Sequence, residues 1–502
     1  MGFIRIMITA ITLLPLFAAF LILLMPARRV NYIKTTAFMG AIGSLLMTSY
    51  CLYHFDASAG LQFEEKFAWI PLLSIEYHVG LDGFNALLVL LVSIVTQLVL
   101  MASLSVTKNV KTYFIMLLLE VTALYGVFTS LNFFQWFLYW EVCLIPIFVL
   151  IKTHGGENRH KAAISFVLFT VLGSVAMLIA FLFLYVKTGT FDFIELAQLA
   201  KDGQLKLLLG DYYFWIFLCI LMGFWVKVPL VPLHIWQIPT YAQAPIPVTM
   251  FLTGVLSKMG IYGFLRIVWP LFPEAMQAHA EWLIGFALAT LLLGAFAAMR
   301  QKHLRAVMTY SSLNHVAYCA FGVFAMGFVL QDTPLDARSL ALQGVILQMF
   351  SHGIVAAGLF YMIGILESRT KTDRIDQMSG LGNVIPKFTA IFGILAFSSL
   401  GLPFLAGFSA EILIFSGSFA LAPTQTILAT LALLATGVFI LNAIRNVFTG
   451  PKPKGSDMAD ITPVELSPVL PFVFMSFLIG ILPSVWLVYS NKTVQELILN
   501  LF

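Results

Sequence analysis

Charged residues are scarce in this sequence. They make up 10% of its 502 residues, while hydrophobic residues make up 60%. Soluble domains usually contain about 25% charged and about 45–50% apolar residues. The apolar excess is too large for a globular core, which predicts that lipid surrounds most of the chain. The sequence also lacks the alternating apolar and polar segments of a membrane β-barrel, so it predicts an all-α integral membrane protein.

Cysteines are few and isolated. The chain has four, with no CxxC pair among them, at Cys51, Cys143, Cys219 and Cys319. This spacing excludes the common iron–sulfur, haem and zinc motifs. No GxGxxG motif follows a strand pattern to bind a nucleotide. We therefore expect no cofactor and no metal in this chain, and no redox chemistry of its own.

Long apolar segments recur along the whole sequence. A helix that spans a bilayer needs about 20 apolar residues, and fourteen such helices are predicted. They are centred near residues 16, 43, 93, 120, 142, 174, 222, 257, 288, 317, 352, 401, 436 and 478.

Lysine and arginine fall mainly in the loops after odd-numbered helices, such as Arg300, Lys302 and Arg305 after the ninth. Positive loops stay on the cytoplasmic side of a membrane. This bias predicts a cytoplasmic position for these loops and an outer position for both termini. The acidic segment 54–82 then lies outside.

Two of the predicted helices are interrupted. Helix 7 breaks at Pro229 and Pro232 within "WVKVPLVPLHIW" (225–236), and helix 12 breaks within "GLPFLAGFSAE" (401–411). The two helices are five apart and cross the membrane in opposite senses, a pattern typical of inverted repeats around a midplane site.

The interrupted helices divide the chain into four predicted parts. These are residues 1–110, with helices 1–3 and the outer segment 54–82; residues 111–271, the first repeat of helices 4–8; residues 272–450, the inverted repeat of helices 9–13; and residues 451–502, a cytoplasmic loop and helix 14.

Five charged residues lie too deep in predicted helices to reach water: Glu120, Glu141, Lys227, Lys258 and Glu411. Each costs about 2.5–3.5 kcal/mol to insert, so together they cost on the order of 10 kcal/mol, which is comparable to the stability of a whole domain. One interpretation is structural pairing, for instance of Glu141 with Lys227. The other is a chain of protonatable sites across the bilayer. The helix break beside Lys227 favours the second, because free backbone groups are tolerated only in protein or a wet cavity.

Three histidines accompany these charges. His315 and His352 have small polar neighbours, and His234 follows Pro232 near the cytoplasmic end of helix 7. A histidine that titrates near neutral pH can relay protons, but a neighbouring serine can equally hold it as a structural residue. The role of Glu120 is open in the same way.

Several of these segments together match a known family. They are "FFQWFLYWEVCLIPIFVLI" (133–151), "WVKVPLVPLHIW" (225–236), "FLTGVLSKMGIYGFLR" (251–266), "RAVMTYSSLNHVAY" (305–318) and "FSHGIVAAGLFYMIG" (350–364). Over nearly its full length the chain resembles the antiporter-like membrane subunits of proton-pumping NADH:quinone oxidoreductase, respiratory complex I.

Among these subunits the chain is most similar to the subunit M type. The segment 63–91 matches the outer segment and third helix of that type. In addition, Glu411 stands where the subunit L and N types usually have a lysine.

The resemblance implies a path of protonatable side chains. Its proton-translocating residues are Glu141, Lys227, Lys258 and Glu411, with Glu141 and Lys227 as an interacting pair, Lys258 as the central relay and Glu411 as the terminal site facing the periplasm. Its relay histidines are His234, His315 and His352.

The resemblance also implies a setting for the chain. NAD, FMN, iron–sulfur clusters and quinone would be bound by partner subunits of the peripheral redox arm. The neighbours in the membrane would be subunits of the L and N types and lipids, and no nucleic acid is expected. The location would be the bacterial cytoplasmic (inner) membrane, and the enzyme a proton-translocating NADH:quinone reductase.

One segment departs from the family pattern. After helix 7 the family usually reads close to "W-L-P-D-A-H-x-x-A-P", whereas this chain reads "WQIPTYAQAP" (236–245). Pro239 and Tyr241 occupy the positions where the family has the aspartate and the histidine. Two titratable groups expected near the cytoplasmic mouth are therefore missing. His234 and Tyr241 are the candidates to replace them. His303 likewise stands where the family tends to have an acidic residue.

Three other functions fit parts of the pattern. The chain resembles, less closely, a subunit of a multi-chain sodium/proton antiporter, and the membrane arm of a related hydrogenase or ferredoxin-driven complex. A purely structural membrane spacer is the third alternative. It predicts that neutralising Lys227 leaves pumping intact.

Overall fold

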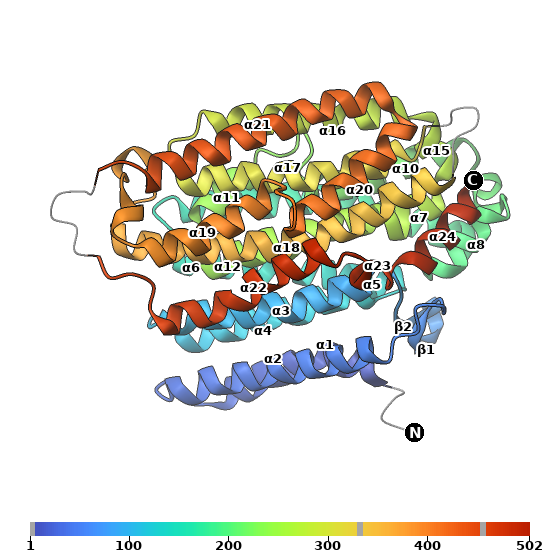
Figure 1. The fold of residues 1–502 in the computed structure, drawn as a ribbon. Helices are drawn as coiled ribbons and strands as arrows, with labels where there is room; N and C mark the ends of the chain where they lie inside the picture. Colours follow the sequence, from blue (N-terminus) through green and yellow to red (C-terminus); the bar gives the residue numbers. More distant parts are fainter. Residues whose placement is uncertain (1–5, 329–334, 452–457) are drawn as a thin grey trace.

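Long apolar helices lie side by side in the computed structural model, which describes residues 6–328, 335–451 and 458–502 (Figure 1). The longer helices are α1 (Met7–Leu24), α2 (Val30–Tyr53), α3 (Ala86–Ala102), α4 (Val110–Thr129), α5 (Phe133–Val142), α6 (Leu144–His154), α7 (Arg159–Thr188), α10 (Tyr213–Lys227), α16 (Ala280–Met299), α17 (Leu304–Ala325), α18 (Leu335–Thr370), α19 (Pro386–Ser399), α20 (Ala406–Leu421), α21 (Pro423–Phe448) and α22 (Pro463–Ile481). The shorter ones are α8 (Phe193–Lys201), α9 (Gln204–Leu209), α11 (Gln237–Gln243), α12 (Ile246–Phe251), α13 (Ser257–Gly263), α14 (Trp269–Leu271), α15 (Pro273–Ala278), α23 (Ser484–Leu487) and α24 (Asn491–Leu501).

The helical prediction is confirmed. Within the described ranges, 12 helices are long and apolar enough to cross a membrane. Thirteen of the predicted centres fall inside a helix, and the remaining one, residue 401, falls in the break between α19 and α20. The number of helices that cross, and the inverted repeats, stay predictions. Residues 452–457 of the expected cytoplasmic loop lie outside the described residues.

Both predicted helix breaks are present. The first separates α10, which ends at Lys227, from α11, because Pro229 and Pro232 supply no N–H groups to continue the helix. The second separates α19 from α20. There Gly401 has φ +76°, a backbone conformation that costs glycine little and other residues much more.

The outer segment contains a β-hairpin that the all-α prediction missed. Strand β1 (Gln62–Ile70) pairs antiparallel with β2 (Ile75–Leu81), and Phe67 stacks on its cross-strand partner Tyr77 at 4.7 Å. The hairpin is anchored to the helices, since Glu65 Oε1 accepts a hydrogen bond of 2.6 Å from the N–H of Ile8 in α1. A single hairpin is marginal in water, so these contacts stabilise it.

The centre of the bundle is formed by two segments. All of the apolar stretch of Ile246–Leu271 and 94% of that of α18 are buried, compared with 39% for α7. Figure 1 shows α18 in the middle, with α1 and α2 at one edge and α16 and α21 at the opposite edge. The outer helices turn apolar side chains to lipid, while the central segments carry Lys258 and His352.

Candidate functional site

Lys227 is the last residue of α10, beside the first break. Its side chain is buried, and Nζ lies 5.0 Å from the centre of the Trp140 ring and 5.9 Å from that of Phe166. Aromatic faces attract cations at such distances. Within the described part of the chain, Nζ has no hydrogen-bond partner. Its three donors are therefore available to water or to an approaching carboxylate.

The two carboxylates whose charge acts on Lys227 are Glu120 on α4 and Glu141 on α5. Neither is bonded to Nζ within the described residues, and both oxygens of Glu120 are buried without a partner there. Glu141 instead lines an apolar groove of about 350 Å³ between α5, α6 and α7.

No salt bridge joins Glu141 to Lys227 among the described residues, although the charge of each acts on the other. Trp140 contacts the ammonium, and its neighbour Glu141 lies about 100° further round the helix. This rotation turns the carboxylate toward the groove.

Lys258 lies in α13, between two π-helical segments, η5 (Leu252–Leu256) and η6 (Phe264–Val268). Such segments are frequent at functional sites. The Nζ atom lies 2.5 Å from the carbonyl oxygen of Thr253, 3.2 Å from Oγ of Ser257 and 2.8 Å from Nδ1 of His352. All three donors of the ammonium are thus engaged, which fixes the lysine against the histidine.

His352 on α18 lies next to His315 on α17. Their ring centres are 5.0 Å apart. Both line a cavity of about 10 Å³ together with polar side chains that include Ser351 and Ser399. A cavity of this size holds roughly one water molecule, so it can join the two rings by hydrogen bonds.

Glu411 on α20 follows His315. Its Oε1 atom lies 3.2 Å from Nδ1 of His315, and Nε2 of His315 lies 3.0 Å from Oγ of Ser399. Oε1 has no hydrogen-bond partner among the described residues, so the contact with Nδ1 is an ion pair only when His315 is protonated. Nε2 of Gln348 lies 3.1 Å from the same Nδ1. The two side chains therefore compete for one nitrogen of His315.

The second helix break shapes the surroundings of Glu411. A Cβ atom at Gly401 would lie 2.5 Å from Oε2 of Glu411. The positive φ requires glycine, and a Cβ atom there would displace the end of the Glu411 side chain. The break thus brings its backbone against the carboxylate.

Four titratable side chains therefore form one connected line across four helices. It runs from Lys258 through His352 and His315 to Glu411. Protonatable groups at hydrogen-bond distance, or one water apart, can exchange protons. The polar contacts along the line also offset the cost of burying its charges.

A second charged cluster lies between the hairpin and the start of α8. Nζ of Lys66 lies 2.9 Å from Glu76, 3.2 Å from Glu195 and 3.6 Å from Asp192. Carboxylate oxygens of these three acids lie within 4.8 Å of one another, a spacing that would suit a metal ion. The lysine ammonium supplies the positive charge among them instead.

Asp192 also bonds His78 on β2 and caps α8. Burial alone would raise the pKa of Asp192. The hydrogen bond and charge of His78, the amide of Glu195 and the charge of Lys66 outweigh burial and lower that pKa. The cluster therefore clamps the hairpin to α8 through an ionised carboxylate.

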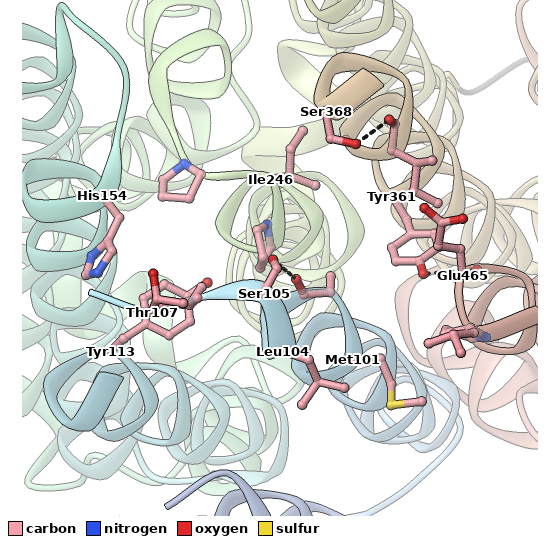
Figure 2. Close-up of a pocket in the computed structure, with 18 of the residues that line it drawn as sticks. Met101, Leu104, Ser105, Thr107, Tyr113, His154, Ile246, Tyr361, Ser368 and Glu465 are labelled. Atoms are coloured by element: carbon pink, nitrogen blue, oxygen red, sulfur yellow. Dashed lines mark hydrogen bonds between the residues drawn. The ribbon is translucent and has the colours of Figure 1, made fainter. Parts of the chain in front are cut away.

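A pocket of about 620 Å³ lies where the ends of α3, α6, α12, α18 and α22 meet. Figure 2 shows His154 and Thr107 on one side of it and Tyr361 and Glu465 on the other. The Tyr361 hydroxyl donates to the Glu465 carbonyl at 3.0 Å. Among the described residues that line this pocket, none belongs to the predicted relay.

Comparisons with known proteins decide the family. The family model described as "NADH:quinone oxidoreductase/Mrp antiporter, TM" matches residues 130–436, more than half of the chain. NADH-quinone oxidoreductase subunit M of Rickettsia prowazekii (strain Madrid E) is 30% identical over 494 residues, which cover 97% of each chain. The chain belongs to this family, as a subunit M type. The resemblance seen in the sequence is confirmed.

Solved structures share the fold of this subunit M-type chain. A chain of respiratory complex I from Thermus thermophilus superposes with a TM-score of 0.83 at 27% identity, over 98% of this chain and 99% of that one. A chain of the Mrp complex from Dietzia sp. DQ12-45-1b gives a TM-score of 0.83 at 20% identity, over 99% and 98% of the two chains. The second likeness shows the fold alone.

Tyr241 and His234 are the candidates to replace the titratable groups missing from the altered family segment, and their surroundings differ. Tyr241 is buried in α11, and its hydroxyl donates to the Leu252 carbonyl at 2.8 Å. His234 is half-buried in the break, and its Nδ1 has no partner in the described part of the chain. His303 bonds Asp373 at 2.7 Å on the surface. Tyr241 alone thus contacts the helix segment that carries Lys258.

Sequence reasoning missed several side chains that complete this subunit M-type site. Gln348 and Ser399 contact His315, and Trp140 contacts Lys227. One signal was available. Gln348 precedes His352 by four residues, which places both on one helix face.

Proposed function

We propose that this chain is a proton-translocating membrane subunit of an NADH:quinone oxidoreductase. The observation that supports the proposal most is the connected line from Lys258 to Glu411 in a chain of the subunit M type. A structural spacer would need neither a buried lysine bonded to a histidine nor two histidines beside a water-sized cavity.

The geometry suggests how a proton would move. Lys258 would give a proton to Nδ1 of His352, which lies 2.8 Å away. The proton would then pass through the small cavity between the rings to His315. Each transfer is short, and the low-polarity surroundings strengthen the hydrogen bonds that guide it.

His315 would exchange partners as it gains a proton. A neutral ring can accept at Nδ1 from the amide of Gln348, 3.1 Å away. A protonated ring donates at both nitrogens and would turn its charge to Glu411, 3.2 Å away. The arriving proton would therefore be handed to the carboxylate, from which it would leave toward the periplasm.

The energy for this movement would come from partner subunits. Moving one proton against 100 mV takes about 2.3 kcal/mol. We infer that the peripheral arm, with NAD, FMN, iron–sulfur clusters and quinone, supplies it. The charges of this chain, including Lys227, Glu120 and Glu141, would respond to that reaction and cause Lys258 to take up a proton.

We further infer the setting of the chain in the bacterial cytoplasmic membrane. The positive loops support a periplasmic position for both termini. Residues 111–271 and 272–450 would be the inverted repeats, and subunits of the L and N types would be neighbours among the membrane lipids. The breaks at 228–236 and 400–405 occupy corresponding places in the two repeats, which supports this division.

The first experiment is to tag the chain, extract it in mild detergent and identify the proteins recovered with it by mass spectrometry. We expect flavin- and iron–sulfur-binding NADH-oxidising subunits and quinone-site subunits. Recovery of small membrane subunits without any redox protein would contradict the proposal. It would support the antiporter alternative, which the shared fold of the Mrp chain allows. Recovery of hydrogenase or ferredoxin-oxidising subunits would support the other alternative.

A further inference from the structure

Gln237 is a fully buried residue with an unusual environment. It begins α11 after the first break and has 0% of its surface exposed. Among the described residues, neither Nε2 nor Oε1 of its amide has a hydrogen-bond partner. Buried polar groups in folded proteins are almost always bonded to protein or ordered water. The unpaired amide of Gln237 is therefore a candidate site for ordered water.

Gln237 lies one helical turn before Tyr241, which contacts the segment that carries Lys258. Tyr241 lies four residues later, on the same face of α11, and its hydroxyl donates to the Leu252 carbonyl in η5. Farther along η5, the carbonyl of Thr253 accepts from Lys258 at 2.5 Å.

The other end of α11 reaches the surface. Ala242 and Gln243 line a polar pocket of about 700 Å³, here called the vestibule, together with Arg305, the ion-paired Glu367 and the exposed His303. This end carries the positive loops, so it is the cytoplasmic side under the proposed topology. Six residues of helix, about 9 Å, separate Gln243 from Gln237.

Helix α17 runs beside α11 from the same vestibule. Arg305 near its start donates to the carbonyls of Ala242 and Ala244 at the end of α11, at 3.2 and 3.0 Å. Ser312, about 10 Å farther along, forms a 2.7 Å hydrogen bond with the hydroxyl of Thr253. Polar side chains of both helices thus lead from the vestibule to Lys258.

We propose that Gln237 is a positioning residue for proton uptake: its buried amide holds the water through which protons pass from the vestibule, beside Tyr241, to Lys258. This inference rests on the proposed function. Gln237 occupies a position where the family pattern has a leucine. The aspartate and histidine of that pattern are replaced by Pro239 and Tyr241. Each water or hydroxyl accepts one proton and passes on another, so one proton moves and no other bond changes.

The test is Gln237→Met, which keeps the length of the side chain and removes both amide atoms. It is measured in the assembled complex, as proton uptake by inverted membrane vesicles driven by NADH. We expect the uptake rate to fall about tenfold, the effect of losing one well-placed hydrogen bond. The rate should also become more sensitive to D₂O, because proton transfer then limits turnover. Gln97→Met on α3, where the amide bonds only its own helix, is the matched control and should keep the rate.

A normal rate in an assembled Gln237→Met complex would overturn the inference, as would a slower rate with an unchanged isotope effect. If that variant does not assemble, Tyr241→Phe, which deletes a single oxygen atom, replaces it. The uptake rate and the isotope effect of Tyr241→Phe then test the inference in the same way. Lys258→Ala is measured in parallel. Uptake that persists in Lys258→Ala would refute the proposed function itself, whereas loss there with normal uptake in Gln237→Met would refute only the inference.

Discussion

The ammonium of Lys258 lies 2.8 Å from Nδ1 of His352, a residue 94 positions later in the chain. This contact joins α13 to α18, and so connects the two predicted repeats at their buried centre. Because His352 also neighbours His315, this contact begins the line of side chains that ends at Glu411.

Removal of His352 should interrupt this line. We expect His352→Ala to lower NADH-driven proton uptake by about 10²-fold, the usual size of a lost proton-transfer group. The complex should still assemble on a native gel, because the change creates only a small cavity. His54→Ala, at an exposed outer position, is the control. Uptake at the normal rate in His352→Ala would rule out the path through this ring.

Glu411 should act through its ability to take a proton. Glu411→Gln keeps the shape and polarity of the side chain beside His315 but cannot ionise. Proton uptake should fall by about 10²-fold, with the amount of assembled complex unchanged. Glu496→Gln, at an exposed pair with Lys492, should change neither quantity. Loss of assembly in Glu411→Gln would point to a structural role instead.

Gly401 should tolerate no side chain. Gly401→Ala places a methyl group 2.5 Å from Oε2 of Glu411 at a positive φ, so we expect a loss of about 1–3 kcal/mol of stability and impaired pumping. Gly393→Ala in α19 is the matched control, since its added methyl group would meet only Phe397 at 4.0 Å. The measurement is the midpoint temperature of thermal unfolding of each purified variant. Equal midpoint temperatures would show that the backbone at Gly401 has room for a side chain.

Asp192 should stabilise the hairpin in a pH-dependent way. Its pKa is lowered because His78, the Glu195 amide and Lys66 together outweigh burial. A carboxyl group with a lowered folded-state pKa stabilises the fold above its ordinary pKa of about 3.9, and this contribution disappears as the pH falls through the lowered value.

Asp192→Asn should therefore weaken hydrogen-exchange protection of β1 and β2 by about 1–3 kcal/mol at neutral pH. The difference from the unchanged protein should shrink as the pH falls below about 4. Asp211→Asn, on the same side of the protein and exposed, is the control. A difference that does not depend on pH would show that the carboxylate charge is not what holds the hairpin.

Much of the fold follows from local features of the sequence. Apolar runs of sufficient length predict helices, because a backbone in lipid must satisfy its hydrogen bonds internally. Pro229, Pro232 and Gly401 predict the breaks, because proline lacks an N–H and glycine tolerates positive φ. The hairpin was missed because its short strands lie outside the apolar runs, and its stability depends on contacts with α1 and α8.

The sequence by itself determined which side chains are buried charges, since a lysine or glutamate within an apolar run stands out without knowledge of the fold. Tertiary structure alone decided which of them touch. It bonded Lys258 to His352, brought Glu411 within 3.2 Å of His315, and turned the Lys227 ammonium to the Trp140 ring rather than into a salt bridge with Glu141. The physical reason is that a hydrogen bond needs atoms within about 3 Å, and the rotation of each packed helix, which no single segment specifies, sets that distance.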